Sequence, residues 1–440
     1  MKPQNDLFPD DRKALKSIPL FALILFLLLQ TGDVWAQTDT LRLTLPQAEE
    51  LFLRKNFTLL AQKYNVNIAE AAVQQARLWD NPNLQIEVNA YNPNTGKLFP
   101  MTNQTHDPLN PSGGSYSWQL QQMINLAGRR SKLVALNQTG VDIQQATFQD
   151  VMRALRFQLA QTFGNLQAEQ AQVQLLQDER QRLSGLIDAF RAQLKLGVVA
   201  EYEVTRLELE QKNADAGLGQ LQAQISQDEA TLRVLLADPG ATYYLPQVPA
   251  PAVVSSDLNK LLDDALAQRP DLQVAQKQGL FASRNLTYQK SLATPQLMLG
   301  ADYERFGNAY PSYVGLQVGM DLPVKNRNQG NIQAAKVGIE QTKDLSSQAE
   351  LQVRQDVISA WQQYQNALSL KAGISDDYLA RIAEISRNAT ADYQKRVIDQ
   401  VSFIDKIRSY KDAQLNLIQL NNQVFQTRQQ LNFVTNTHSF

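Results

Sequence analysis

Four short segments of the chain alternate apolar and polar residues with a period of two, at about 84–92, 115–124, 297–305 and 313–322. Successive side chains of a strand point to opposite faces, so the alternation predicts strands with one apolar and one polar face. Two interpretations fit this pattern. One is a half-buried soluble sheet whose polar face meets water, and the other is a membrane barrel whose polar face lines a wet lumen.

Each pair of predicted strands is followed by a long stretch with apolar residues at three- and four-residue steps. Residues 112–238 and 324–440 contain none of the 17 prolines. Because a proline inside a helix costs about 3 kcal/mol, these stretches permit unusually long helices, and their narrow apolar seam is typical of coiled coils. A helix over about 128–194 would be ~100 Å long at ~1.5 Å per residue, which fits a tube better than a compact domain.

The same order of elements occurs twice in the chain. Residues 56–84 align without gaps to 269–297, and residues 193–236 align to 392–435, with identities in the same order. Each copy is predicted to contain a helix, two strands, a long helix, a turn and a helix. The sequence therefore predicts a first repeat over 37–237, a proline-rich linker over 238–256 that wraps the helical body, and a second repeat over 257–440.

The N-terminal segment resembles a secretory signal peptide over residues 1–36. Arg12, Lys13 and Lys16 precede an apolar run over 18–29, and Val34-Trp35-Ala36 suits cleavage near Ala36. The alternative is a membrane anchor, but this run is shorter than the ~20 residues that span a bilayer. The chain has no cysteine, so we expect no disulfide and no lipid-modified cysteine.

Composition and motifs exclude several classes of function. The formal net charge of −1 and a pI near 6.2 give no indication of nucleic-acid binding. The two histidines, His106 and His438, have no partners at metal-ligand spacing, so we expect no metal site and no cofactor. No catalytic motif is recognisable, and we do not expect an enzyme.

Four strands are too few to close a barrel with a pore, because small closed barrels already need about eight. If the strands enter a membrane, several chains must therefore close the barrel together. An exported chain without a membrane helix is periplasmic, is secreted, or spans the outer membrane of a Gram-negative cell as β-strands.

The duplicated unit, the Asn81-Pro82 and Thr294-Pro295 steps before strands and the Gly197-Val198-Val199-Ala200 turn point to one family. The chain resembles the TolC-like outer-membrane efflux channels across essentially its whole mature length. The run over 81–87 is most similar to the branch that serves heavy-metal efflux pumps.

The resemblance implies a mixed α and β membrane protein. It implies a homotrimer with a 12-stranded barrel in outer-membrane lipid and a coiled-coil tube in the periplasm. It also implies a passive channel that receives metal ions, drugs or other small molecules from an inner-membrane pump and a periplasmic adaptor.

The resemblance also assigns candidate functional residues. The hairpin tips that contact the adaptor are Leu196, Gly197, Val198, Val199 and Ala200 in the first repeat, and Lys395, Arg396, Val397 and Ile398 in the second. The periplasmic gate candidates are Glu203, Tyr393 and Asp405. The alternatives are that Gly197 only supplies a turn and that the two acids are solvated surface groups.

Basic residues follow the second and fourth strands, as Arg129, Arg130, Lys132, Lys325 and Arg327. They suit lipid headgroups at the membrane border or, equally, solvated helix starts.

The main alternative function is a periplasmic coiled-coil adaptor or scaffold, although such proteins usually carry a single hairpin. A secreted enzyme is a more distant alternative, because the chain has no recognisable catalytic site.

Overall fold

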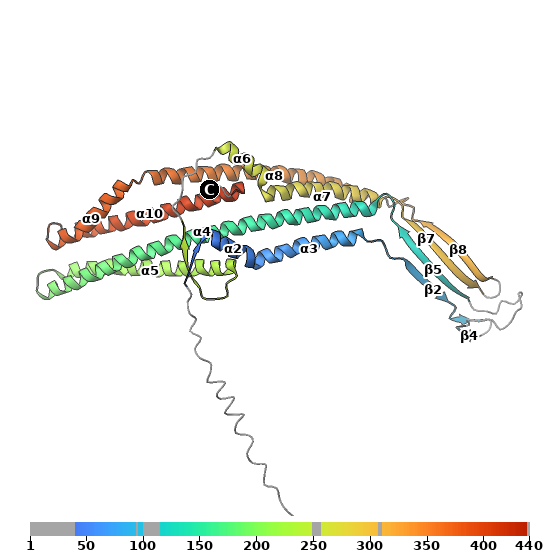
Figure 1. The fold of residues 1–440 in the computed structure, drawn as a ribbon, viewed down its shortest axis with the longest axis horizontal. Helices are drawn as coiled ribbons and strands as arrows, with labels where there is room; N and C mark the ends of the chain where they lie inside the picture. Colours follow the sequence, from blue (N-terminus) through green and yellow to red (C-terminus); the bar gives the residue numbers. More distant parts are fainter. Residues whose placement is uncertain (1–39, 94–95, 100–114, 249–256, 307–309, 438–440) are drawn as a thin grey trace, which may run out of the picture.

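The computed structural model describes residues 40–93, 96–99, 115–248, 257–306 and 310–437. Long helices run along the molecule, and a narrow sheet extends from one end (Figure 1). The predicted signal peptide and both histidines lie outside the described residues. Among the described helices, none combines the length and the hydrophobicity needed to cross a membrane.

The first repeat contains one very long helix, α4, which covers Arg129–Lys195 and has 67 residues. At ~1.5 Å per residue it is ~100 Å long. It packs along α5, Glu201–Leu236, to which a short turn connects it. Together these two helices form the first hairpin.

The second repeat departs from the prediction of one long helix. Its helices are α8, Gln329–Ala372, α9, Asp376–Gln394, and α10, Gln400–Thr435. The prediction is wrong here because Gly373 is a poor helix former and Ser375 starts a new helix. The Ser375 side chain accepts a hydrogen bond from the Tyr378 backbone N–H at 3.1 Å.

Two pairs of shorter helices precede the strands. They are α2, Leu45–Lys55, with α3, Phe57–Arg77, and α6, Leu258–Gln268, with α7, Pro270–Leu292. The pairs divide at Asn56 and Arg269, which are equivalent positions in the sequence repeat.

The two division points are stabilised differently. The Asn56 side chain accepts from Leu59 N at 3.0 Å and donates to Leu235 O at 2.9 Å. Arg269 instead forms ion pairs with Asp271 at 2.6 Å and Asp356 at 2.9 Å.

One sheet of four antiparallel strands has the order β2-β5-β7-β8. The strands cover Asn83–Val88, Ser115–Ile124, Leu297–Phe306 and Tyr310–Met320. β2 ends before the predicted limit of the first strand, because Tyr91–Asn92 (β3) pairs instead with Lys97–Leu98 (β4).

The register places like residues in rows across the sheet. One row is Leu84, Leu120, Ala301 and Leu316, and the next on that face is Ile86, Trp118, Tyr303 and Val314. The opposite face contains the row Gln85, Gln119, Asp302 and Gly315. The apolar face is bare, and Leu316 is 87% exposed in the single chain.

The helices next to the sheet form a layer in the order α3-α4-α7-α8 (Figure 1). α3 leads into β2, α4 follows β5, α7 leads into β7 and α8 follows β8. The helix layer therefore continues the strand order, and both end in free edges formed by the same two parts of the chain.

A small parallel pair was not predicted from the sequence. β1, Thr40–Thr44, pairs with β6, Tyr243–Gln247, so part of the predicted linker is a strand. Tyr244 of β6 is 2% exposed and joins a core with Phe52, Phe163 and Leu232. This core fastens the connection between the repeats to the middle of α4 and the C-terminal end of α5.

Candidate functional site

The turn between α4 and α5 forms the first hairpin tip. Val198 N donates to Gln193 O at 3.0 Å, and Gly197 N donates to Leu194 O at 2.9 Å. Gly197 has a φ of 71°, which a glycine adopts without steric cost. These bonds satisfy the last carbonyl groups of α4 and reverse the chain.

The turn between α9 and α10 repeats this geometry with a different residue. Val397 N donates to Asp392 O at 2.8 Å, and Arg396 has a φ of 59°. A left-handed conformation costs a residue with a Cβ about 1–2 kcal/mol. The Arg396 side chain donates to Val198 O at 3.3 Å, so the two tips lie next to each other.

The tips present apolar side chains to solvent. Leu196 is 78% exposed and Val397 is 69% exposed in the single chain. Val199 and Ile398 point inward and pack on the core between the hairpins. The tips therefore combine exposed apolar contacts with a fixed backbone.

An aromatic stack fastens the two hairpins together just past the tips. The Tyr393 ring lies 5.1 Å from Phe190 of α4 and 4.7 Å from Phe403 of α10, measured between ring centroids. The Tyr393 hydroxyl donates to Glu203 Oε2 at 3.3 Å. Burial, and then the neighbouring Glu203 carboxylate, raise the pKa of Tyr393. The hydroxyl is thus held protonated as a donor between the hairpins.

The structure brings together two of the three gate candidates but not the third. Asp405 is exposed, because Phe403, Ile404 and Ile407 occupy the buried face of α10. At ~3.6 residues per turn, position 405 lies on the opposite side of the helix. Within one chain, Asp405 therefore does not join Glu203 and Tyr393.

The charged contacts that lie further from the tips were not predicted from the sequence. Arg408 Nε of α10 donates to Glu210 Oε2 of α5 at 3.0 Å, and Glu210 is buried. Arg182 of α4 pairs with Glu179 and donates to Ser386 Oγ of α9 at 3.3 Å. The partners across the hairpins are about 200 residues apart, so no local spacing reveals them. The partners lie at a similar number of residues from their two hairpin tips, and this spacing was the one feature of the sequence that could have revealed the contacts.

The polar face of the sheet has its own cluster. The Gln119 and Gln317 side chains are hydrogen bonded, and Gln121 donates to Gln317 Oε1 at 3.3 Å. Asp302 is 7% exposed and fills the space that Gly315 leaves. A Cβ at residue 315 would lie 2.5 Å from Asp302 Oδ1, so a larger residue there would displace the Asp302 carboxylate.

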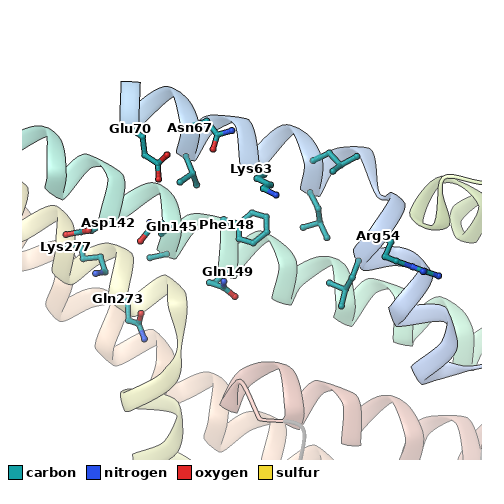
Figure 2. A pocket seen from close by; sticks show the side chains of 15 residues that line it. Arg54, Lys63, Asn67, Glu70, Asp142, Gln145, Phe148, Gln149, Gln273 and Lys277 are labelled. Atoms are coloured by element: carbon teal, nitrogen blue, oxygen red, sulfur yellow. The ribbon is translucent and has the colours of Figure 1, made fainter. Parts of the chain in front are cut away.

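A groove of about 890 Å³ lies elsewhere on the helix layer. Figure 2 shows Lys63 and Glu70 from α3, Asp142 from α4 and Lys277 from α7 around it. This open groove is lined by both basic and acidic side chains. The groove is distant from the first hairpin tip, because its lining residue Phe148 precedes the end of α4 at Lys195 by about 47 residues, or ~70 Å of helix. Within the described ranges, no group of three His, Cys, Asp or Glu residues is arranged to hold a metal ion.

Residues 50–238 and 261–437 match the family model of outer membrane efflux proteins. The chain belongs to this family. The resemblance to TolC-like channels is thereby confirmed, and an adaptor or an enzyme is not favoured.

Two curated members of the outer membrane efflux family are similar in sequence. The cobalt-zinc-cadmium resistance protein CzcC of Cupriavidus metallidurans is 22% identical over 385 residues, which cover 87% of this chain and 88% of that protein. The outer membrane efflux protein BepC of Brucella suis is 22% identical over 430 residues, covering 94% and 88%.

Solved structures show the same fold. CusC, whose structures were described in connection with folding and transmembrane channel formation, has a TM-score of 0.71 at 17% identity. The match covers 89% of this chain and 91% of the CusC chain. The outer membrane protein VceC of Vibrio cholerae has a TM-score of 0.70 at 15% identity, covering 89% and 96%.

Proposed function

We propose that three copies of this efflux protein close into one channel, with a 12-stranded barrel in the outer membrane and a helical tube in the periplasm. The shared order of strands and helices carries this proposal. β2 with α3 forms one free edge, and β8 with α8 forms the other. β8 of one copy meets β2 of the next in antiparallel direction, as the alternation within the sheet requires.

The number of copies follows from the size of the lumen. Two copies supply eight strands, and barrels of that size are filled by their own side chains. Three copies supply 12 strands and leave room for passage. A head-to-tail contact that closes into a ring also removes every free strand edge. Free strand edges are not tolerated in lipid.

The chemistry of the two faces of the sheet supports an arrangement in which one face meets lipid and the other lines the lumen. The bare apolar rows with Leu316 and Val314, which is 73% exposed, suit lipid. The opposite rows contain Gln119, Asp302 and Glu304 and suit a wet lumen. The acidic side chains of this face favour cations among the possible cargo, and CzcC is named for resistance to metal ions.

The hairpin tips form the periplasmic end in this proposal. Exposed Leu196, Val198 and Val397 offer apolar contacts to an adaptor, and Lys395 and Arg396 add charge. Glu203 and Tyr393 hold the hairpins together, and symmetry brings the copies of Asp405 toward one another. An inner-membrane pump then supplies the cargo, and cleavage near Ala36 releases the mature chain.

The decisive experiment combines mass and conductance. We expect protein purified in mild detergent to have the mass of three chains and to form channels in planar bilayers. A stable monomer with full β content would refute the proposal. Changing Lys395 and Arg396 to Ala should leave conductance largely intact and impair pump-dependent resistance in cells.

A further inference from the structure

Basic residues gather at the joint where the strands meet the helix layer. We define the joint as residues 77–82, 125–132, 290–296 and 321–328. Its acidic residues are Asp80 and Asp321. Its basic residues are Arg77, Arg129, Arg130, Lys132, Lys290, Lys325 and Arg327. This is a concentrated positive charge in a chain whose net charge is −1.

These positive charges are not neutralised by the chain itself. Within the described residues, none of the seven basic side chains forms an ion pair. Arg129 Nη2 donates to Thr294 O at 3.3 Å, and Arg130 Nη1 donates to Arg77 O at 3.3 Å. Carbonyl groups orient the guanidinium groups but leave their charge available. Asp80 is already engaged, because its Oδ2 accepts from Asn125 at 2.6 Å.

The joint borders the bare apolar face of the sheet. The apolar alternation of β8 continues beyond the strand through Leu322 and Val324, which are 71% and 68% exposed. Lys325 follows at once. On the β2 side, Trp79 is 64% exposed, and the Arg130 guanidinium lies 3.9 Å from its ring centroid. Tryptophan and arginine in this arrangement are typical of a membrane border.

We propose that the joint is a docking surface for anionic phospholipid headgroups in the periplasmic leaflet of the membrane. This rests on the proposed function, which places the apolar face in lipid. Phosphate groups would meet unpaired guanidinium and ammonium groups while the acyl chains cover the adjoining apolar rows. Three copies would repeat the joint around the channel, so each trimer would carry a closed basic belt.

The test variant removes three charges without disturbing the orienting hydrogen bonds. Arg77→Gln, Lys290→Gln and Lys325→Gln change exposed side chains for which the described residues show no hydrogen bond. The matched control is Lys55→Gln, Lys336→Gln and Lys343→Gln, which removes the same charge from exposed positions on the helices.

Trp79 is a local reporter of bound lipid. In a chain that starts at Gln37 and carries Trp118→Phe and Trp361→Phe, it is the remaining tryptophan. Quenching by brominated phosphatidylglycerol is compared with quenching by brominated phosphatidylcholine in reconstituted trimers. We expect a preference for the anionic lipid that falls about fivefold for each charge removed, or about 100-fold in the triple variant. The control should keep the preference, and high salt should weaken it.

Three results would overturn the docking surface. They are equal quenching by both lipids in the parent chain, an undiminished preference in the triple variant, or a changed ion selectivity of conductance with unchanged lipid preference. The last would place the belt in the lumen. Absence of trimers or channels would instead refute the proposed function.

Discussion

Leu316→Arg places a charge in the middle of the bare apolar face. Leu316 is 87% exposed in the single chain, so the substitution removes almost no contact within the monomer. The cost arises on insertion, where an arginine near the bilayer midplane costs about 2–4 kcal/mol. Three copies raise this to about 6–12 kcal/mol per trimer, which is comparable with the whole folding stability of a typical protein, about 5–15 kcal/mol.

The matched control is Gln85→Arg, which lies on the opposite face one row away. Gln85 is exposed and adjoins Gln119 in the row that contains Asp302, so an arginine there meets water and a nearby carboxylate. The assay is the heat-modifiable trimer band in outer-membrane fractions. We expect the band to disappear for Leu316→Arg and to remain for Gln85→Arg. The reverse outcome would show that the faces are assigned the wrong way round.

The remaining predictions concern the gate and a buried acid. Tyr393→Phe should keep the aromatic stack but lose about 1 kcal/mol from the bond to Glu203, so single-channel recordings should show more frequent opening, and unchanged gating would contradict the link. Glu203→Ala with Asp405→Ala should weaken cation selectivity and divalent block, whereas unchanged block would place these carboxylates on the solvated side. Burial, and then the Asp228 carboxylate, raise the pKa of Glu169 to about 7, so the stability of the folded helices should fall as pH rises from about 4.5 through 7. Thermal unfolding followed by circular dichroism should show this slope, and Glu169→Gln should flatten it.

Much of the fold follows from local patterns in the sequence. The proline-free stretch and the apolar seam predict α4, because helix length depends on the absence of breakers and on neighbouring residues. The same reasoning missed the break at Gly373, since one glycine and one serine cap are weak signals within an otherwise helical stretch. It also missed β6, because Tyr244 is ordered by packing on helices far away in sequence.

The sequence named the gate candidates but did not predict which of them are in contact. The positions of Glu203 and Tyr393 came from the family resemblance, and their contact appears in the structure at 3.3 Å. The side of α10 on which Asp405 lies depends on which face of that helix is buried. Burial of that face depends on the first hairpin, to which Phe190 and Glu210 belong.

The periodicity of the strands and of α4, the two faces of each strand and the duplication could all be derived from sequence patterns, most of which involve residues close together in the chain. The common order of strands and helices, the contact between the tips and the unpaired charge of the joint became visible only when the whole chain was folded. The contact between the tips joins residues 198 apart in the chain, and the contacts of the joint span between 45 and 165 residues. Their geometry is set by packing of the two repeats against each other, and no short-range pattern encodes it.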